Sequence, residues 1–90
     1  MEIIYSSKFA REYKKLPSNI KDIAEEQETL FRKNPFDPKL KTHKLKGKLS
    51  GSWACEAGYD LRIIFDFIIK QGQGEDDILL LAIGSHEEVY

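Results

Sequence analysis

Two histidines, two acids and an arginine are the side chains of this 90-residue chain best suited to acid–base or phosphate chemistry. His43 and His86 titrate near neutral pH, which suits general acid–base catalysis. Glu56, Asp60 and Arg62 lie in a predicted hairpin, with a parity that places them on one face if its strands pair. These residues could act on a phosphodiester. They could also be two surface histidines and a solvated cross-strand ion pair, and the spacing leaves both interpretations open.

Lysines are concentrated between residues 39 and 48, next to His43. Residues 1–48 contain 12 basic and 7 acidic side chains, a net +5, whereas residues 49–90 contain 2 basic and 8 acidic ones, a net −6. The total of −1 therefore conceals two opposed halves, and it is the local field that attracts a polyanion. The lysines are either an ordinary solvated loop or a set of phosphate contacts: Lys39, Lys41, Lys44, Lys46 and Lys48.

The elements that must position these residues can be located from hydrophobic periodicity. A β-branched run at 2–5 predicts a strand, and apolar spacings of three and four predict helices over 8–16 and 20–31. Alternation of apolar and polar residues between 52 and 69 predicts a β-hairpin. The apolar run 78–83, ended by Gly84, predicts a central strand. The hairpin strands are expected at 52–57 and 60–69, joined by a tight turn at Gly58-Tyr59.

This order predicts one α+β domain over residues 1–90, arranged β-α-α-β-β-β. A helical hairpin should pack on a small antiparallel sheet, with 39–48 as a connecting loop. Cys55 and Trp53 alternate onto the face that should meet the helices. Cys55 is therefore expected to be a buried hydrophobe, and Trp53 a residue at the core rim, where an aromatic beside a basic loop could stack on a base.

Several classes of protein are excluded by size and composition. A chain of this length is too small for a second domain or a large cofactor cavity, so no cofactor is expected. No apolar run is long enough to span a membrane and the first residues lack a secretory signal, so a cytoplasmic protein is expected. One cysteine and two histidines give no disulfide framework and no four-ligand metal site without carboxylates.

Three motifs together resemble the RelE/ParE toxin superfamily, and most closely its YafQ-like branch. They are His43-Lys44-Leu45-Lys46-Gly47, the strand motif within 58–65 that reads Tyr59-Asp60-Leu61-Arg62-Ile63-Ile64-Phe65, and the C-terminal Gly84-Ser85-His86 that closes on Tyr90. The resemblance covers nearly the whole chain. It implies a toxin of a type II toxin–antitoxin pair that enters the ribosomal A site and cleaves translated mRNA without a metal. The implied partners are a cognate antitoxin, the ribosome and mRNA.

The resemblance also implies roles for single residues. In the family reaction the ribose 2′-OH attacks the adjacent phosphate, which requires a base, a group that stabilises phosphoryl charge and an acid. His43, Asp60 and His86 match the branch's functional positions, Arg62 matches a strand arginine that would steady the phosphate, and Tyr90 matches a terminal aromatic that can pack on a base.

Two positions depart from the branch, and alternatives remain open. Glu56 replaces a histidine and Ala82 replaces an arginine, so Glu56 is expected to act as a base and Arg62 to supply the cation. One alternative is a ParE-like inhibitor of DNA gyrase that catalyses nothing. Another is an inactive member that only binds its antitoxin.

Overall fold

The computed structural model describes residues 2–58, 60–69, 72, 74 and 76–85, and of Lys48 the backbone alone. Strand β1 (Ile3–Tyr5) leads into helices α1 (Ser7–Lys14) and α2 (Ser18–Lys33). The short turn η1 (Pro38–Leu40), strand β2 (His43–Lys44) and the turn η2 (Gly47–Leu49) follow, and then three longer strands. These strands are β3 (Trp53–Glu56), β4 (Leu61–Ile68) and β5 (Asp77–Ser85).

Local chemistry explains both helix boundaries. The Ser6 hydroxyl accepts a hydrogen bond from the Phe9 N–H at 3.0 Å and so caps α1, as its position predicts. Pro17 precedes α2, which ends at Lys33 and is followed by its C-cap Asn34, because Pro35 disfavours further helix. The two predicted helices are therefore confirmed.

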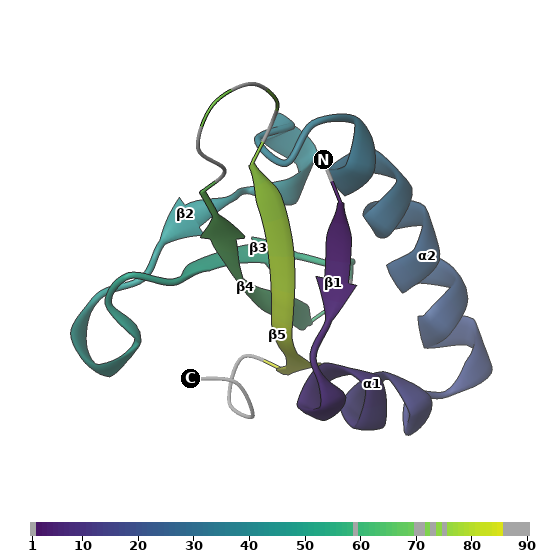
Figure 1. Cartoon of the computed structure of the whole chain (residues 1–90). Coiled ribbons are helices and arrows are strands. Elements are labelled where there is room, and N and C mark those ends of the chain that lie inside the picture. Colours follow the sequence, from purple (N-terminus) through teal and green to yellow (C-terminus); the bar gives the residue numbers. More distant parts are fainter. Residues whose placement is uncertain (1, 59, 70–71, 73, 75, 86–90) are drawn as a thin grey trace.

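The sheet has the order β1-β5-β4-β3-β2, with β1 parallel to β5 and all other pairs antiparallel. The C-terminal meander is as predicted, and β5 is central, flanked by β4 and β1 (Figure 1). The sheet as a whole is mixed and not antiparallel. The reason is that β1 supplies the second neighbour that an apolar central strand requires, and it runs in the same direction as β5.

The segment predicted as a connecting loop contains a further strand. His43 pairs with Ala54 and Lys44 with Trp53, which makes β2 an edge strand. Backbone pairing and the partly buried Leu45 hold this strand, so it shows none of the apolar alternation by which strands are recognised.

The C-terminal strand is longer than its sequence indicates. Gly84 does not end β5 but pairs with Arg62, because a glycine backbone can remain in a hydrogen-bonded ladder. The pairs Ile64–Ala82 and Phe65–Leu80 leave Leu81 as an extra residue, a β-bulge. The bulge turns both Ile83 and Leu80 toward the helices although they lie three residues apart.

The core lies between the helices and one face of the sheet. Figure 1 shows α2 alongside β1 and α1 across the end of β5. Phe31 of α2 meets Phe65 of β4 edge to face, with ring centroids 4.9 Å apart. The other face of the sheet carries a smaller cluster, in which Leu45 and Leu81 pack against Ala54, Ile64 and Ala82. We call this second surface the helix-free face.

Candidate functional site

The helix-free face carries three of the predicted site residues. Cross-strand partners point to the same side of a sheet, so His43 shares this face with its partner Ala54. Glu56 and Arg62 pair with each other and lie two residues from Ala54 and Ile64, which places both on the same face. Strands β2, β3 and β4 therefore present a histidine, a carboxylate and a guanidinium on one face of the sheet.

Arg62 is anchored on one side and available on the other. Its Nη2 lies 3.1 Å from Glu56 Oε1, and its Nη1 donates to the Leu61 carbonyl at 3.1 Å. The Arg62 and Glu56 side chains are 20% and 26% exposed, so the pair is partly shielded from water. A guanidinium has five N–H donors, and among the described residues these two contacts use two of them. Arg62 can therefore hold an anion without giving up its anchor.

Lys41 links the carboxylate to the histidine. Its Nζ lies 3.6 Å from Glu56 Oε2, so a cation approaches each oxygen of Glu56. Lys41 adopts a left-handed backbone conformation with φ 51°, uncommon for a residue with a side chain. Its carbonyl oxygen lies 2.9 Å from His43 Nδ1. Because a carbonyl can only accept, Nδ1 carries the hydrogen, and Nε2 of the neutral ring keeps a lone pair that can take a proton.

The remaining predicted residues lie elsewhere or outside the described part of the chain. Asp60 is exposed in the turn before β4 and forms no hydrogen bond or ion pair among residues 2–58, 60–69, 72, 74 and 76–85. His86, Tyr90 and the Lys48 side chain are outside the described residues. Exposed lysines surround β2: Lys39 in η1, Lys46 after β2, and Lys44, which points to the opposite face over the Trp53 ring.

One residue on this face was not identified from the sequence. Asp66 pairs with Leu79 and lies two residues beyond Ile64 on β4, which places it on the helix-free face. Its Oδ1 is buried and has no hydrogen-bond partner among the described residues, which is uncommon for a carboxylate oxygen. In the sequence, Asp66 is simply one polar position of an alternating strand.

The match to a protein family decides what kind of protein this is. The sequence profile of the YafQ family, described as the bacterial toxin of a type II toxin–antitoxin system, matches residues 1–90. The chain belongs to the YafQ toxin family. A comparison with curated protein sequences gives no match.

Solved structures of other toxins share the fold of this YafQ-family chain. YafQ from E. coli superposes with a TM-score of 0.74 at 18% identity, covering 99% of this chain and 97% of that one. The RelBE2 toxin–antitoxin complex from Mycobacterium tuberculosis gives 0.73 at 15% identity, covering 94% and 96%. A metal-bound toxin from Helicobacter pylori gives 0.67 at 28% identity, covering 100% and 99%. In this chain, the described residues contain no cluster of three or more potential metal ligands.

The two departures from the YafQ-like pattern, Glu56 and Ala82, both lie on the helix-free face. Ala82 is 5% exposed in the small cluster, next to Ile64. It supplies no charge. The described cations in contact with Glu56 are Arg62 and Lys41.

Cys55, on the other face of β3, is 1% exposed. Burial raises the pKa of its thiol to about 12, which keeps it protonated and confirms its expected place in the core.

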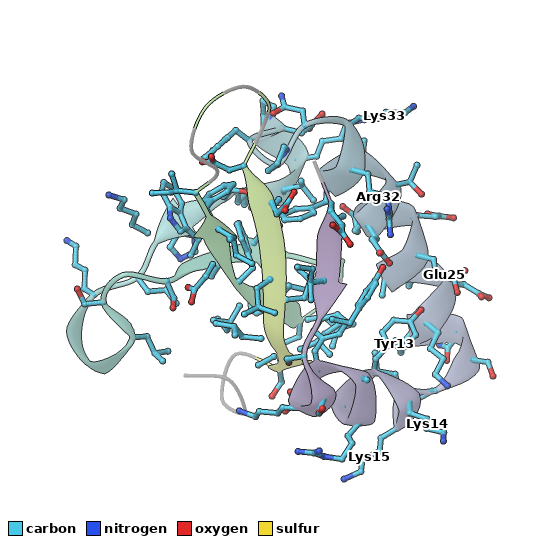
Figure 2. All side chains as sticks on the ribbon, viewed as in Figure 1. Tyr13, Lys14, Lys15, Glu25, Arg32 and Lys33 are labelled. Atoms are coloured by element: carbon cyan, nitrogen blue, oxygen red, sulfur yellow. The ribbon has the colours of Figure 1, made fainter. Side chains whose placement is uncertain are left out.

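A groove of about 490 Å³ lies between α1, α2 and the end of β1, away from all predicted site residues. Figure 2 shows Tyr13 pointing toward Glu25, and the phenol donates to this carboxylate at 3.3 Å. Burial, with the nearby carboxylates, raises the pKa of Tyr5 and of Tyr13. Arg32 donates to the Tyr5 oxygen at 2.8 Å. The groove therefore has an apolar floor, and on its rim Glu25 and Glu28 are hydrogen-bonded to Tyr13 and Arg32. No helix in the described part of the chain is long and apolar enough to cross a membrane.

Proposed function

We propose that this YafQ-family toxin is an endoribonuclease that cleaves mRNA in the ribosomal A site and so stops translation. The observation that supports it most is the placement of His43 and Arg62 on one face, with a ring nitrogen and guanidinium donors that no described residue contacts. Proton transfer and stabilisation of phosphoryl charge are the two needs of RNA cleavage through the 2′-hydroxyl. The exposed lysines around β2 would hold neighbouring phosphates.

In the proposed reaction the 2′-oxygen attacks phosphorus while its proton passes to Nε2 of His43. The bond from phosphorus to the 5′-oxygen breaks, which leaves a 2′,3′-cyclic phosphate and, after protonation, a free 5′-hydroxyl. Arg62 would donate to the phosphoryl oxygens as charge accumulates on them. No metal takes part in this scheme.

Glu56 has a different part from the base expected of it. Each of its oxygens faces a cation, Arg62 on one side and Lys41 on the other. We therefore assign it the task of holding these two cations in place, and the histidine that of the base. His86 as the acid for the leaving oxygen, Asp60 as a further polar group and Tyr90 as a base-packing residue stay predictions from the family resemblance.

We also propose an antitoxin partner. The RelBE2 neighbour is a toxin–antitoxin complex, and the family description names such a system. Residues 1–48 carry a net +5, which would attract a partner with acidic segments. Action on ribosomes would require a cytoplasmic protein, and we propose that location.

A cell-free translation reaction with a defined message tests the proposal. The purified protein should cut the message only while it is translated, and the upstream product should end in a cyclic phosphate. The gyrase-inhibitor alternative predicts an intact message and blocked DNA supercoiling in a parallel reaction. The inactive alternative predicts no effect in either assay together with tight antitoxin binding.

A further inference from the structure

Three aromatic rings form a continuous surface where α2 ends, on the side of the sheet opposite the proposed active site. Phe36, in the loop after α2, stacks on Phe67 with centroids 5.8 Å apart and an interplanar angle of 17°. The same ring meets Trp53 edge to face at 5.4 Å. Phe36 is 52% exposed, whereas Trp53 and Phe67 are half-buried beneath it. We call these three residues the aromatic platform.

The loop that carries Phe36 is held in place. The Phe36 N–H donates to the Asn34 side chain at 3.0 Å, and the Asp37 N–H donates to the Asn34 carbonyl at 3.0 Å. Thr42 donates to the Pro35 carbonyl, and Leu40, in the adjoining turn, is completely buried. Exposed apolar residues are common singly. Here an aromatic ring is fixed in an exposed position by its own loop, which lowers the entropy lost when a ligand covers it.

The charges around the platform favour an anionic ligand. The Lys44 Nζ lies 5.4 Å from the centroid of the Trp53 ring, a cation–π arrangement. Lys33 ends α2 and Lys39 lies in η1, three residues to either side of Phe36, and Figure 2 shows Lys33 pointing outward. The one acid of this loop, Asp37, accepts the Lys39 N–H at 2.9 Å. Aromatic rings bordered by lysines are typical of surfaces that bind single-stranded nucleic acids.

Strand β2 connects the platform to the proposed active site. His43 and Lys44 are adjacent in an extended strand, so they point to opposite faces. Because β2 is an edge strand, one RNA strand can pass over it and contact both residues. We infer that the aromatic platform stacks an unpaired base of the substrate RNA, close in sequence to the bond that is cut, with Phe36 as the main contact. The inference rests on the proposed function, since it takes RNA as the substrate.

A short RNA that cannot be cleaved isolates this contact from the chemistry. A series of fully 2′-O-methylated ten-nucleotide RNAs, each with 2-aminopurine at a different position, would be titrated with the purified toxin at low salt. We expect quenching of the probe at one position. Phe36→Leu should abolish the quenching and weaken binding about 5- to 150-fold, since a stacked base is worth about 1–3 kcal/mol. Phe36→Tyr should retain both.

The controls separate this inference from its alternatives. Tyr5→Leu removes another exposed ring, at the opposite edge of the sheet, and should bind RNA like the wild type. Lys44→Gln should weaken binding of every RNA and lower its salt dependence. Unchanged binding and quenching with Phe36→Leu, or no RNA binding by the wild type, would overturn the inference.

Two further outcomes distinguish the inference from the proposed function. Loss of antitoxin binding by Phe36→Leu with unchanged RNA binding would assign the platform to a protein partner and overturn the inference. Stacking by a toxin that leaves translated messages intact would overturn the proposed function alone.

Discussion

Replacement of Arg62 by glutamine should remove most of the cleavage activity while the protein stays folded. Within the described part of the chain, the contacts of Arg62 with Glu56 and with the Leu61 carbonyl use two of its five N–H donors. Loss of a donor that faces developing negative charge costs about 10²- to 10³-fold in rate. We therefore expect Arg62→Gln to cut a translated message about 10²- to 10³-fold more slowly.

The cost in stability should be much smaller. The Arg62–Glu56 pair is about one-fifth to one-quarter exposed, so we expect its contribution to lie at the upper end for surface pairs, about 1 kcal/mol. For a domain of this size that corresponds to a fall of at most about 4–8 °C in Tm. Single-turnover cleavage of a defined message and thermal unfolding of the same preparation measure the two effects. Arg11→Gln, which removes an exposed arginine from α1, is the matched control and should leave both nearly unchanged.

A double-mutant cycle tests how Arg62 and Glu56 cooperate. If Glu56 acts by holding the guanidinium, Glu56→Gln should slow cleavage in the wild type and add little in the Arg62→Gln background. Additive losses would return Glu56 to the role of an independent base. A folded Arg62→Gln protein that cleaves within about threefold of the wild type would refute the assignment of Arg62.

Three more predictions concern His43, Cys55 and Gly58. His43→Ala should lower single-turnover cleavage about 10²- to 10⁴-fold with Tm nearly unchanged, because it removes the proposed base; unimpaired cleavage would exclude this role. The raised pKa of buried Cys55, about 12, means that the unfolded chain loses this proton first as pH rises above about 9, so stability should fall between pH 9 and 12. At pH 10 the loss is about 1.4 kcal/mol, and urea unfolding of Cys55→Ala should lack this component. Gly58→Ala would place a Cβ 2.2 Å from Ile23 Cγ2 at φ +81° and should cost about 1–3 kcal/mol; Ile23→Ala in the same chain should restore part of it, and no restoration would contradict the contact.

Helices and strands with a clear hydrophobic periodicity could be predicted from the sequence. The α2 stripe and the alternation in β4 predict their elements because burial of one face determines both. Strand β2 could not be predicted in this way. It consists of two exposed residues, His43 and Lys44, and exists because the backbone of β3 leaves an edge to pair with. The bulge at Leu81 likewise depends on the pairing of β4 with β5, which no local pattern records.

The sequence predicted several residues of the candidate site, but not all of the contacts between them. Parity within the hairpin predicted that Glu56 and Arg62 would meet, and they pair directly. The contact of Lys41 with both Glu56 and His43 depends on a left-handed backbone at a lysine, a conformation that residue type does not indicate. Asp60 has the matching parity, yet it lies in the turn, where alternation no longer determines direction. Alternation along a strand thus predicts which face of the sheet a side chain occupies, whereas the conformation of the loops determines the contacts of residues such as Lys41 and Asp60.

The most direct test of the account is to map the 5′ ends of cellular mRNA after brief induction of the wild type, of His43→Ala and of Arg62→Gln, each with and without the antitoxin. The account predicts discrete new ends with 5′-hydroxyl groups inside translated frames for the wild type alone. The antitoxin should suppress these ends, and both variants should lack them. An unchanged pattern of mRNA ends in cells whose growth the wild type arrests would contradict the account.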